Sequence, residues 1–338
     1  MKSLLITSTG VNAGKTTLAL GIGLNFKGKV GYLKPLGDRI RNKLDEDAIL
    51  FKEVFGLSED ALKLTVENNY FGILKDLKDV DIGEKLKVRY DEISKGKDFM
   101  ILESPQNISY GAYAKVSAPE ISIKLRLKAL IVAEGDSKYI QDKLSIAKGY
   151  FDVMGAELAG CIINKSKKSL RDEIEDCIKV FGEIPEEKLL KIIRVKEIAE
   201  HLDAKILAGE GGVGNLVEHI LVGAMTFDSA IKMLEKLRYE NNAIITGGDR
   251  TDLQLAGFES NASCLILTEN IFPNPSVLRK ADERKIPVLL VPYDTVSAIK
   301  ETERVISKIR AEDKQKLKKI KELTLRHVNL ETLLEDLT

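Results

Sequence analysis

Near its N-terminus the sequence carries a lysine and a hydroxyl residue directly after a glycine turn, the residue types with which proteins bind phosphate. The stretch ITSTGVNAGKTT (6–17) nearly matches G-x-x-x-x-G-K-[ST], in which backbone N–H groups and the lysine hold phosphate oxygens. Counting back from Gly14, Thr9 stands where the first glycine belongs, and Gly10 follows it. The stretch is therefore either a phosphate-binding loop with an unusual entry or a glycine turn that happens to precede a lysine.

The sequence on either side of this stretch favours the phosphate-binding alternative. A short apolar run (3–8) precedes it and predicts a strand, and the segment that opens at Lys15 predicts a helix. Helix N-termini hold anions because their first N–H groups have no partners within the helix. Gly14 would let the backbone close around a β-phosphate, Lys15 would reach the β and γ oxygens, and Thr16 would ligate Mg²⁺. We therefore expect the following residues to contact the nucleotide: Gly10, Asn12, Ala13, Gly14, Lys15, Thr16 and Thr17.

A magnesium site also needs carboxylates, because Mg²⁺ takes hard oxygen ligands. Glu103 ends the apolar run FMILE, so its carboxylate is expected at the carboxyl edge of a sheet, where open α/β sheets bind ligands. Asp47 lies in LDEDAILF at the start of a predicted helix, where it is either a second ligand or a helix cap. With Asp47 as a ligand, the predicted Mg²⁺ ligands are Thr16, Asp47 and Glu103.

Short strands alternating with amphipathic helices are expected to position these residues. Five nearly continuous apolar runs predict strands buried on both faces of a parallel sheet: 3–8, 30–35, 98–104, 128–135 and 158–165. Helices are predicted between them at 15–26, 45–55, 139–154 and 168–180. The second half repeats the alternation around AIITGG, SCLILTE and PVLLVPY. The predicted fold is α/β, with a P-loop NTPase-type parallel sheet between two helical layers and a second, smaller α/β domain.

The domain boundary is predicted close to residue 190. A turn at Pro185 is followed by charged helix without a long flexible linker, so the domains are expected to pack rather than swing freely. We predict a nucleotide-binding domain over 1–190, a second domain over 191–310 and a charged C-terminal helix over 311–338. Sparse apolar positions in that last segment favour a solvated helix that covers an edge over one that binds a partner.

Composition narrows the classes of partner. The 338 residues have a formal net charge of +0, so nothing draws the whole chain to nucleic acid or to an anionic membrane. No apolar run approaches the length of a membrane span, and we expect a cytoplasmic protein. The three histidines are scattered, which supports neither a zinc site nor a Ser-His-Asp triad. The three cysteines lack C-x-x-C spacing and are expected to be small buried hydrophobes.

Five segments of the first half, in their order and spacing, resemble the dethiobiotin synthetase group of P-loop enzymes, which includes the cobyrinic acid a,c-diamide synthases. These segments are STGVNAGKTT, GYLKPLG, DEDA, ILESP and IINK. The nearest resemblance is to the dethiobiotin-synthetase-like N-terminal region of long phosphotransacetylases. Loops in these families often begin with a small residue such as Thr9. The resemblance implies ATP as ligand, with Lys15 on the phosphates, Asn164 on the adenine and Pro185 near the base. It also implies Mg²⁺ at the three ligands named above.

The same resemblance gives Lys34 a catalytic role beside Lys15. Lys34, in KPLG, matches the lysine that contacts the substrate and the transferring phosphoryl group in dethiobiotin synthetase. A lysine at the carboxyl end of a strand beside the loop would neutralise charge on a γ-phosphate; the alternative is a lysine that leaves the strand into solvent. One segment departs from the pattern: ESPQNISYG (103–111) replaces the glycine-rich E-G-A-G-G of dethiobiotin synthetases, which argues against dethiobiotin synthesis but not against ATP and Mg²⁺ binding.

The second half, about 192–308, resembles the DRTGG domain of the same phosphotransacetylases. This resemblance rests on five segments: VKEIAEHLDAKILAG, HILVGAM, AIITGGDRTDLQLAG, LILTENIFPNP and PVLLVPYDT. The turn TGGDRTD is either a ligand site, with Asp249 and Arg250 as polar contacts, or a tight turn that fastens a subunit contact. The glycine cluster GEGGVGN (209–215) is expected to be a flexible turn. Acetyltransferase activity is not expected, because the domain that carries it in those enzymes has no counterpart in this sequence.

Two functions follow from these features. The first is a nucleotide-dependent regulator, in which ATP binding or slow hydrolysis sets a conformation that the DRTGG domain passes to a partner or to a second copy in a dimer. The second is an enzyme of the dethiobiotin synthetase or cobyrinic acid a,c-diamide synthase type that uses ATP to activate a small carboxylate. The altered segment after Glu103 favours the first function, and the retained Lys34 favours the second.

Overall fold

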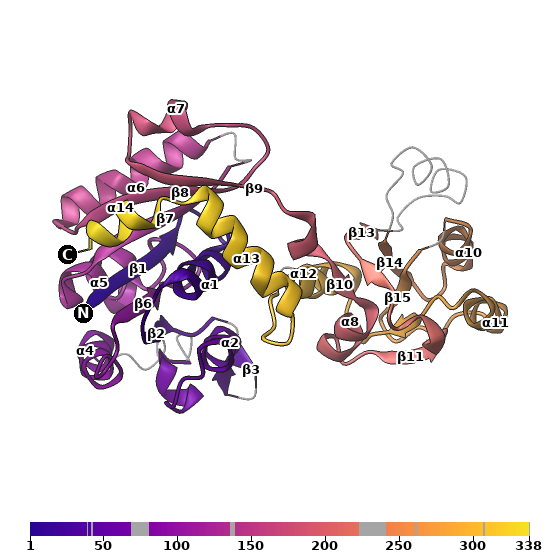
Figure 1. Ribbon diagram of the computed structural model, residues 1–338. Helices are drawn as coiled ribbons and strands as arrows, with labels where there is room; N and C mark the ends of the chain where they lie inside the picture. The colour runs from indigo at the N-terminus through magenta and orange to yellow at the C-terminus, as the bar shows by residue number, and fades with distance from the viewer. Residues whose placement is uncertain are drawn as a thin grey trace. The chain divides into compact units, whose positions relative to one another are not determined.

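The computed structural model describes residues 1–38, 40, 41, 43–68, 81–135, 139–222, 241–260, 262–306 and 308–337. The chain forms two compact units, which are described separately (Figure 1). Unit 1 consists of Met1–Glu186 together with Ile309–Thr338, and unit 2 is Glu187–Lys308. Unit 2 is thus an insertion between two parts of unit 1.

A sheet of seven parallel strands forms the centre of unit 1, in the order β5-β2-β6-β1-β7-β8-β9. The apolar runs of the sequence form its middle strands, which are buried because helices cover both faces. The strands are β1 Lys2–Ser8, β2 Val30–Leu36, β5 Thr65–Glu67, β6 Phe99–Glu103, β7 Lys128–Glu134, β8 Leu158–Ser166 and β9 Val180–Pro185. β3 (Ile40–Arg41) and β4 (Leu44–Asp45) form a separate small hairpin. The predicted fold class is confirmed.

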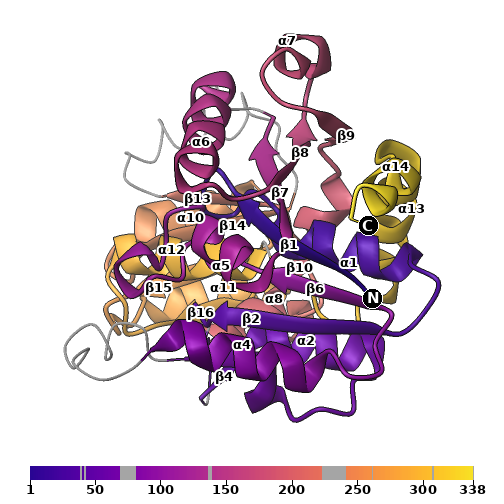
Figure 2. The ribbon, with the colours of Figure 1, turned by 90° about the vertical axis from the view of Figure 1, so that its left-hand side faces the viewer.

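Helices pack on both faces of this sheet (Figures 1 and 2). One face carries α1 (Lys15–Asn25), α2 (Glu46–Phe55) and α13 (Lys314–His327), and the other carries α4 (Ile82–Ile93), α5 (Ala118–Leu125) and α6 (Ile140–Met154). Local sequence sets their ends: the Asp45 side chain caps the start of α2, and left-handed Gly56 and Gly155 end α2 and α6.

The helix expected over 168–180 is wrong in extent. Only α7 (Arg171–Glu175) is helical there, and β9 begins at Val180. Phe181 and Ile184 of β9 are buried against the sheet, and the strand pairs in parallel with β8. Burial of these apolar side chains at the sheet edge outweighs the helical pattern that precedes them.

The C-terminal segment returns to unit 1 as two helices, α13 and α14 (Leu330–Glu335), where the sequence predicted one. Between them Val328 bridges Gly182 of β9 in antiparallel fashion, so this connection covers the outer edge of the sheet. α13 packs along α1 so closely that a Cβ added at Gly21 would lie 1.9 Å from Thr324 Oγ1. Asn25 Nδ2 of α1 also donates to the carbonyl of Lys321.

Unit 2 is a second α/β layer structure with the sheet order β11-β16-β15-β14-β13. The strands are β11 Lys205–Ala208, β13 His219–Val222, β14 Asn242–Gly247, β15 Cys264–Thr268 and β16 Val288–Leu290, all parallel except β11. β10 (Ile193–Arg194) and β12 (Leu216–Val217) pair separately. The helices are α8 Val195–His201, α10 Thr251–Glu259, α11 Pro275–Arg284 and α12 Thr295–Ile306.

Each face of the unit 2 sheet has its own apolar core. Ala243 and Ile245 of β14 face a core that contains α8 and α12 residues such as Ile198 and Ala298. Ile244, between them, faces the opposite core with Phe258 of α10. This alternation follows from the two-residue period of a strand.

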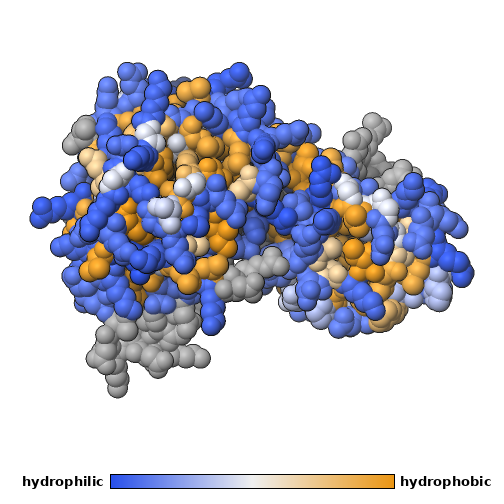
Figure 3. Space-filling model, turned by 60° about the horizontal axis from the view of Figure 1, so that its bottom comes forward, coloured by the Kyte–Doolittle hydropathy of each residue, from blue (hydrophilic) through white to orange (hydrophobic). Residues whose placement is uncertain are grey.

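Hydrophilic and hydrophobic areas alternate on the face drawn in Figure 3. In the part of the chain that the structure describes, no helix combines the length and the apolar composition needed to cross a membrane. The cysteines follow expectation in two of three cases: Cys161 and Cys264 are buried, while Cys177 is partly exposed.

Two glycine substitutions test the docking of α13 on α1. Gly21→Ala should destabilise unit 1 by about 1–3 kcal/mol, because the added Cβ has no room beside Thr324. Gly149→Ala in α6 is the matched control: its Cβ meets nothing within 4 Å, so it should stabilise by roughly 0.5–1 kcal/mol through helix propensity. Urea unfolding followed by circular dichroism measures both. Equal effects of the two substitutions would contradict the close packing of the helices.

Candidate functional site

The loop between β1 and α1 has the geometry of an anion-binding turn. Asn12 and Gly14 are left-handed, with φ of 62° and 99°, and α1 begins at Lys15. Left-handed residues within such a turn bring successive N–H groups to one side, where they form a concave site for anions. Glycine is required at 14 for a second reason: a Cβ there would lie 2.1 Å from Asn164 Nδ2.

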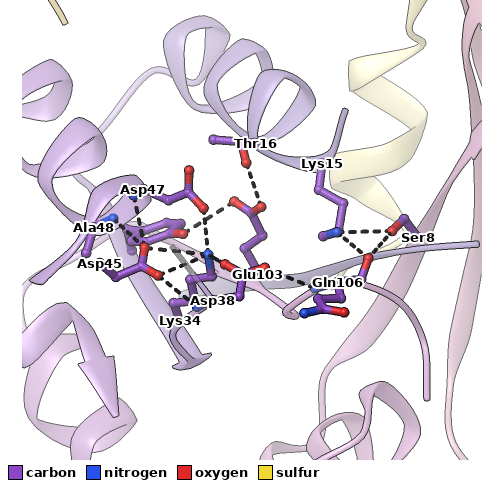
Figure 4. A network of polar contacts seen from close by, with 11 residues as sticks. Ser8, Lys15, Thr16, Lys34, Asp38, Asp45, Asp47, Ala48, Glu103 and Gln106 are labelled. Carbon is purple, nitrogen blue, oxygen red and sulfur yellow. Dashed lines mark hydrogen bonds and ion pairs between the residues drawn. The ribbon is translucent and has the colours of Figure 1, made fainter. Parts of the chain in front are cut away.

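The Lys15 side chain lies beside this loop, and its ammonium donates hydrogen bonds to two oxygens (Figure 4). Its Nζ is 3.1 Å from Ser8 Oγ and 2.7 Å from the carbonyl oxygen of Gln106. Burial lowers the pKa of Lys15, although the carboxylates of Glu103 and Asp38 act in the opposite direction. The side chain is thus ordered beside the loop by neutral oxygens.

Thr16 and Glu103, two of the predicted metal ligands, contact each other directly. Thr16 Oγ1 donates to Glu103 Oε1 at 2.7 Å (Figure 4). The Tyr32 hydroxyl donates to Glu103 Oε2 at 3.3 Å. Burial, and after it the Asp47 carboxylate, raises the pKa of Glu103 to about 7. In the metal-free protein this carboxyl group therefore changes charge near neutral pH.

Lys34 is buried among three carboxylates. Its side chain is 1% exposed, so it does not leave the strand into solvent. Its Nζ lies 2.5 Å from Asp38 Oδ1, 3.3 Å from Asp45 Oδ2 and 2.5 Å from Asp47 Oδ2 (Figure 4). Burial alone lowers the pKa of Lys34, but these carboxylates, Asp47 first, outweigh it and hold the pKa well above its usual value. The lysine is charged at every physiological pH.

The cap of α2 is Asp45 and not Asp47. The Asp45 side chain accepts hydrogen bonds from the backbone N–H groups of Asp47 and Ala48. Asp47 lies two residues after Asp45, and its carboxylate instead accepts a hydrogen bond from Lys34 (Figure 4). The alternative that Asp47 serves as the helix cap is therefore wrong.

The remaining predicted residues lie around the loop. Gly10 accepts from Ser8 Oγ at 2.8 Å through its carbonyl, and Thr17 belongs to the first turn of α1. Asn164 Nδ2 donates to the carbonyl of Ala13 at 2.8 Å. Pro185 ends β9 and pairs with Ser166 in the β8–β9 register.

Sequence reasoning missed several residues of this network: Ser8, Tyr32, Asp38, Asp45, Gln106 and Lys165. Asp45 lies in the same DED run as Asp47, and a closer test of helix-cap spacing could have found it. Gln106 acts through its backbone carbonyl, which no side-chain pattern announces. Asp38 comes from the loop after β2 and reaches the network only because that loop folds back over Lys34.

The residues present suit Mg²⁺. A threonine hydroxyl and two carboxylates, Glu103 and Asp47, lie in one buried network beside the loop, and these are the hard oxygen donors that Mg²⁺ takes. Asp38, Asp45 and Asp47 also have carboxylate oxygens within 4.8 Å of one another. In this second group, however, all three carboxylates form ion pairs with Lys34.

The turn TGGDRTD in unit 2 is tightly packed. A Cβ at Gly248 would lie 1.7 Å from the carbonyl oxygen of Ile271. Glycine is therefore required at this position because the loop after β15 leaves no room for a side chain. Gln254 Nε2 donates to the carbonyls of Gly247 and Gly248 at 2.9 and 3.0 Å. Arg250 pairs with Asp252 of its own helix. These contacts fit a structural turn and leave the ligand and subunit-contact alternatives as proposals.

The GEGGVGN segment is also a packed turn. It contains a short 3-10 helix at Glu210–Gly212, and a Cβ at Gly212 would lie 1.9 Å from the carbonyl oxygen of Lys285. The backbone N–H of Gly209, which is left-handed, donates to Asp282 Oδ1 at 2.6 Å. These contacts fix the turn.

Comparison with known proteins agrees with this architecture. Residues 2–194 match the family described as an AAA domain, which is more than half of the 338 residues, and the chain belongs to that family. Residues 197–305 match the DRTGG domain. The predicted resemblance, a dethiobiotin synthetase-like P-loop domain followed by a DRTGG domain, is confirmed.

Phosphate acetyltransferases are among the curated relatives. The chain is 26% identical over 303 residues to the one from Synechocystis, covering 82% of this chain and 43% of that protein. It is 22% identical to the one from Nitratidesulfovibrio vulgaris, covering 97% of this chain and 50% of that protein. The ATP-dependent dethiobiotin synthetase BioD of Aquifex aeolicus is 27% identical over 169 residues, 48% of this chain and 75% of that enzyme. The chain thus spans half or less of the two acetyltransferases.

Two solved structures are more distant. The septum site-determining protein MinD of Pyrococcus horikoshii, complexed with Mg-ADP, has a TM-score of 0.36 and 16% identity, covering 56% of this chain and 83% of that one. The CBS and DRTGG domains of a Clostridium perfringens pyrophosphatase, complexed with diadenosine tetraphosphate, have a TM-score of 0.30 and 20% identity, covering 48% of this chain and 68% of that one.

The raised pKa of Glu103 predicts how stability depends on pH without metal. The folded value is about 7 and the ordinary value 4.5, so the folded state holds this proton more tightly than the unfolded chain. This difference stabilises the folded state fully below pH 4.5, and the stabilisation is lost as pH rises through 7. The total loss in free energy of unfolding is roughly 3 kcal/mol. Unfolding in EDTA between pH 5 and 8 measures this loss.

Glu103→Gln should remove that part of the pH dependence, because the amide has no proton to lose. Glu53→Gln, on the exposed side of α2, is the matched control and should leave the pH dependence as in the wild type. The same slope in the wild type and in Glu103→Gln would contradict the assignment to Glu103.

Proposed function

We propose that unit 1 binds ATP together with Mg²⁺. The observation that carries this proposal is the convergence of Lys15, Thr16, Asp47 and Glu103, from three separate parts of the chain, into one network beside the loop. A turn with left-handed Asn12 and Gly14 at the start of a helix, followed by a lysine and a metal-ligating hydroxyl, suits a triphosphate.

In this proposal each side chain has a defined task. Lys15 gives up the carbonyl of Gln106 for phosphate oxygens, and the loop N–H groups bind the β-phosphate. Thr16, Glu103 and Asp47 would hold Mg²⁺, which screens the phosphate charge when bound. In the same proposal Asn164 contacts the adenine and Pro185 lies near the base.

We propose further that the protein is a nucleotide-dependent regulator related to the N-terminal part of phosphate acetyltransferases. Unit 2 inserts into unit 1, so both of its ends continue into elements of the nucleotide-binding unit. Its role in this proposal is to pass the nucleotide state to a partner or to a second copy of the chain. A dimer is the expected assembly.

The retained Lys34 supports a second function, an ATP-dependent enzyme that acts on a small carboxylate. Its ammonium contacts Asp47, a ligand of the proposed Mg²⁺ site, and would therefore supply a permanent positive charge beside the phosphates. ADP release that depends on a second small molecule would favour the enzyme. Nucleotide binding that changes the assembly state in sedimentation, without such dependence, would favour the regulator.

Lys15→Ala tests the phosphate site. ATP affinity should fall at least about a hundredfold, because a charge-assisted contact to the phosphates is lost in a buried site. Lys318→Ala, on an α13 lysine whose side chain is 80% exposed, is the control for loss of one positive charge. Calorimetric titration measures both. An unchanged affinity in a folded Lys15→Ala protein would remove the basis of the proposal.

Glu103→Gln tests the metal ligands. The amide keeps the size of the side chain but is a poor Mg²⁺ ligand, so ATP affinity in Mg²⁺ should fall more than ATP affinity in EDTA. Glu53→Gln again serves as the control. Equal losses in the two buffers would mean that Glu103 only holds Thr16 and Tyr32 in place.

A further inference from the structure

Two consecutive residues at the end of β8 hold two consecutive carbonyls of the phosphate loop. Asn164 Nδ2 donates to the carbonyl of Ala13 at 2.8 Å, and Lys165 Nζ donates to the carbonyl of Asn12 at 2.6 Å. Lys165 is itself oriented by Glu134, at the end of β7, whose Oε1 lies 3.2 Å from Nζ. Nothing in the sequence motifs or the comparisons assigns a role to Lys165.

A regular strand cannot make this pair of contacts, because consecutive side chains point to opposite faces of the sheet. β8 is irregular at this point. Lys165 has a left-handed φ of 56°, which is uncommon for a residue other than glycine, and the β8–β9 register shifts between Ile163 and Ser166. Such irregularities re-aim side chains near functional sites. Here the irregularity turns both side chains toward one loop.

The contacts address a physical requirement of a phosphate loop. Its N–H groups can face an anion only if the carbonyls of the same peptide units face away, and those carbonyls then need donors of their own. Asn164 and Lys165 supply such donors to Ala13 and Asn12. Asn164 is 7% exposed, and its amide fills the space that a side chain at Gly14 would take.

We propose that Asn164 and Lys165 are positioning residues that keep the carbonyls of Asn12 and Ala13 turned outward, so that the loop N–H groups face the phosphates. This inference rests on the proposed nucleotide binding. It goes beyond the adenine contact expected of Asn164 and gives Lys165 and Glu134 a role in phosphate affinity. It predicts that both residues matter for a ligand without a base.

Inorganic tripolyphosphate with Mg²⁺ is that ligand. In the full chain, Lys165→Met and Asn164→Ala should each weaken tripolyphosphate and ATP about tenfold or more, by similar factors for the two ligands. Lys165→Arg keeps a donor and a charge and should restore affinity to within about threefold of the wild type. Lys168→Met, which removes an equal charge three residues away, is the matched control and should have little effect.

A second readout needs no ligand. The backbone amide resonances of residues 10–15 in the ligand-free protein should shift in Lys165→Met and stay in place in Lys168→Met. Unchanged tripolyphosphate affinity and unchanged loop resonances in Lys165→Met would overturn the positioning role while nucleotide binding stands. A loss confined to ATP in Asn164→Ala would likewise overturn it for Asn164, as a base contact alone. A wild-type protein that binds neither ATP nor tripolyphosphate would instead refute the proposed function, and the loop resonances would still decide the positioning role.

Discussion

The ammonium of Lys34, buried among Asp38, Asp45 and Asp47, is the interaction on which the site of unit 1 depends. Buried charges without partners cost several kcal/mol each, so strand β2, the loop after it and the start of α2 must stay together. Asp45 strengthens this constraint because the same carboxylate caps α2 and contacts Lys34. The position of Asp47, and with it the proposed metal site, follows from this charge balance.

Gln106 links the two lysines of the site. Its carbonyl accepts from Lys15, while its N–H donates to Asp38 Oδ2 at 3.3 Å, and Asp38 binds Lys34. Gln106 belongs to the segment ESPQNISYG, the segment that departs from the dethiobiotin synthetase pattern. This segment therefore supplies a backbone contact between the lysine of the loop and the buried acids.

The insertion of unit 2 ties that unit to the candidate site at both of its ends. The chain leaves unit 1 after β9, whose last residue Pro185 pairs with Ser166 next to Lys165. It returns through α13, which packs along α1, the helix that begins at Lys15. Gly21 and Thr324 make that packing close. The chain thus enters unit 2 from a strand that pairs beside Lys165, and it returns through a helix that packs along α1.

The sequence by itself determined the α/β fold, the phosphate loop, and the nearness of Thr16 to Glu103, because apolar runs and glycine turns are local signals and parallel strands end at one edge. It did not determine the strand β9, the return of the C-terminal segment, or the partners of Lys15 and Lys34. Those depend on which distant segments pack together and on backbone carbonyls such as that of Gln106. Tertiary structure also decided that Asp45, a helix cap by residue type, contacts Lys34 as well, and that an irregular strand aims Lys165 at the loop.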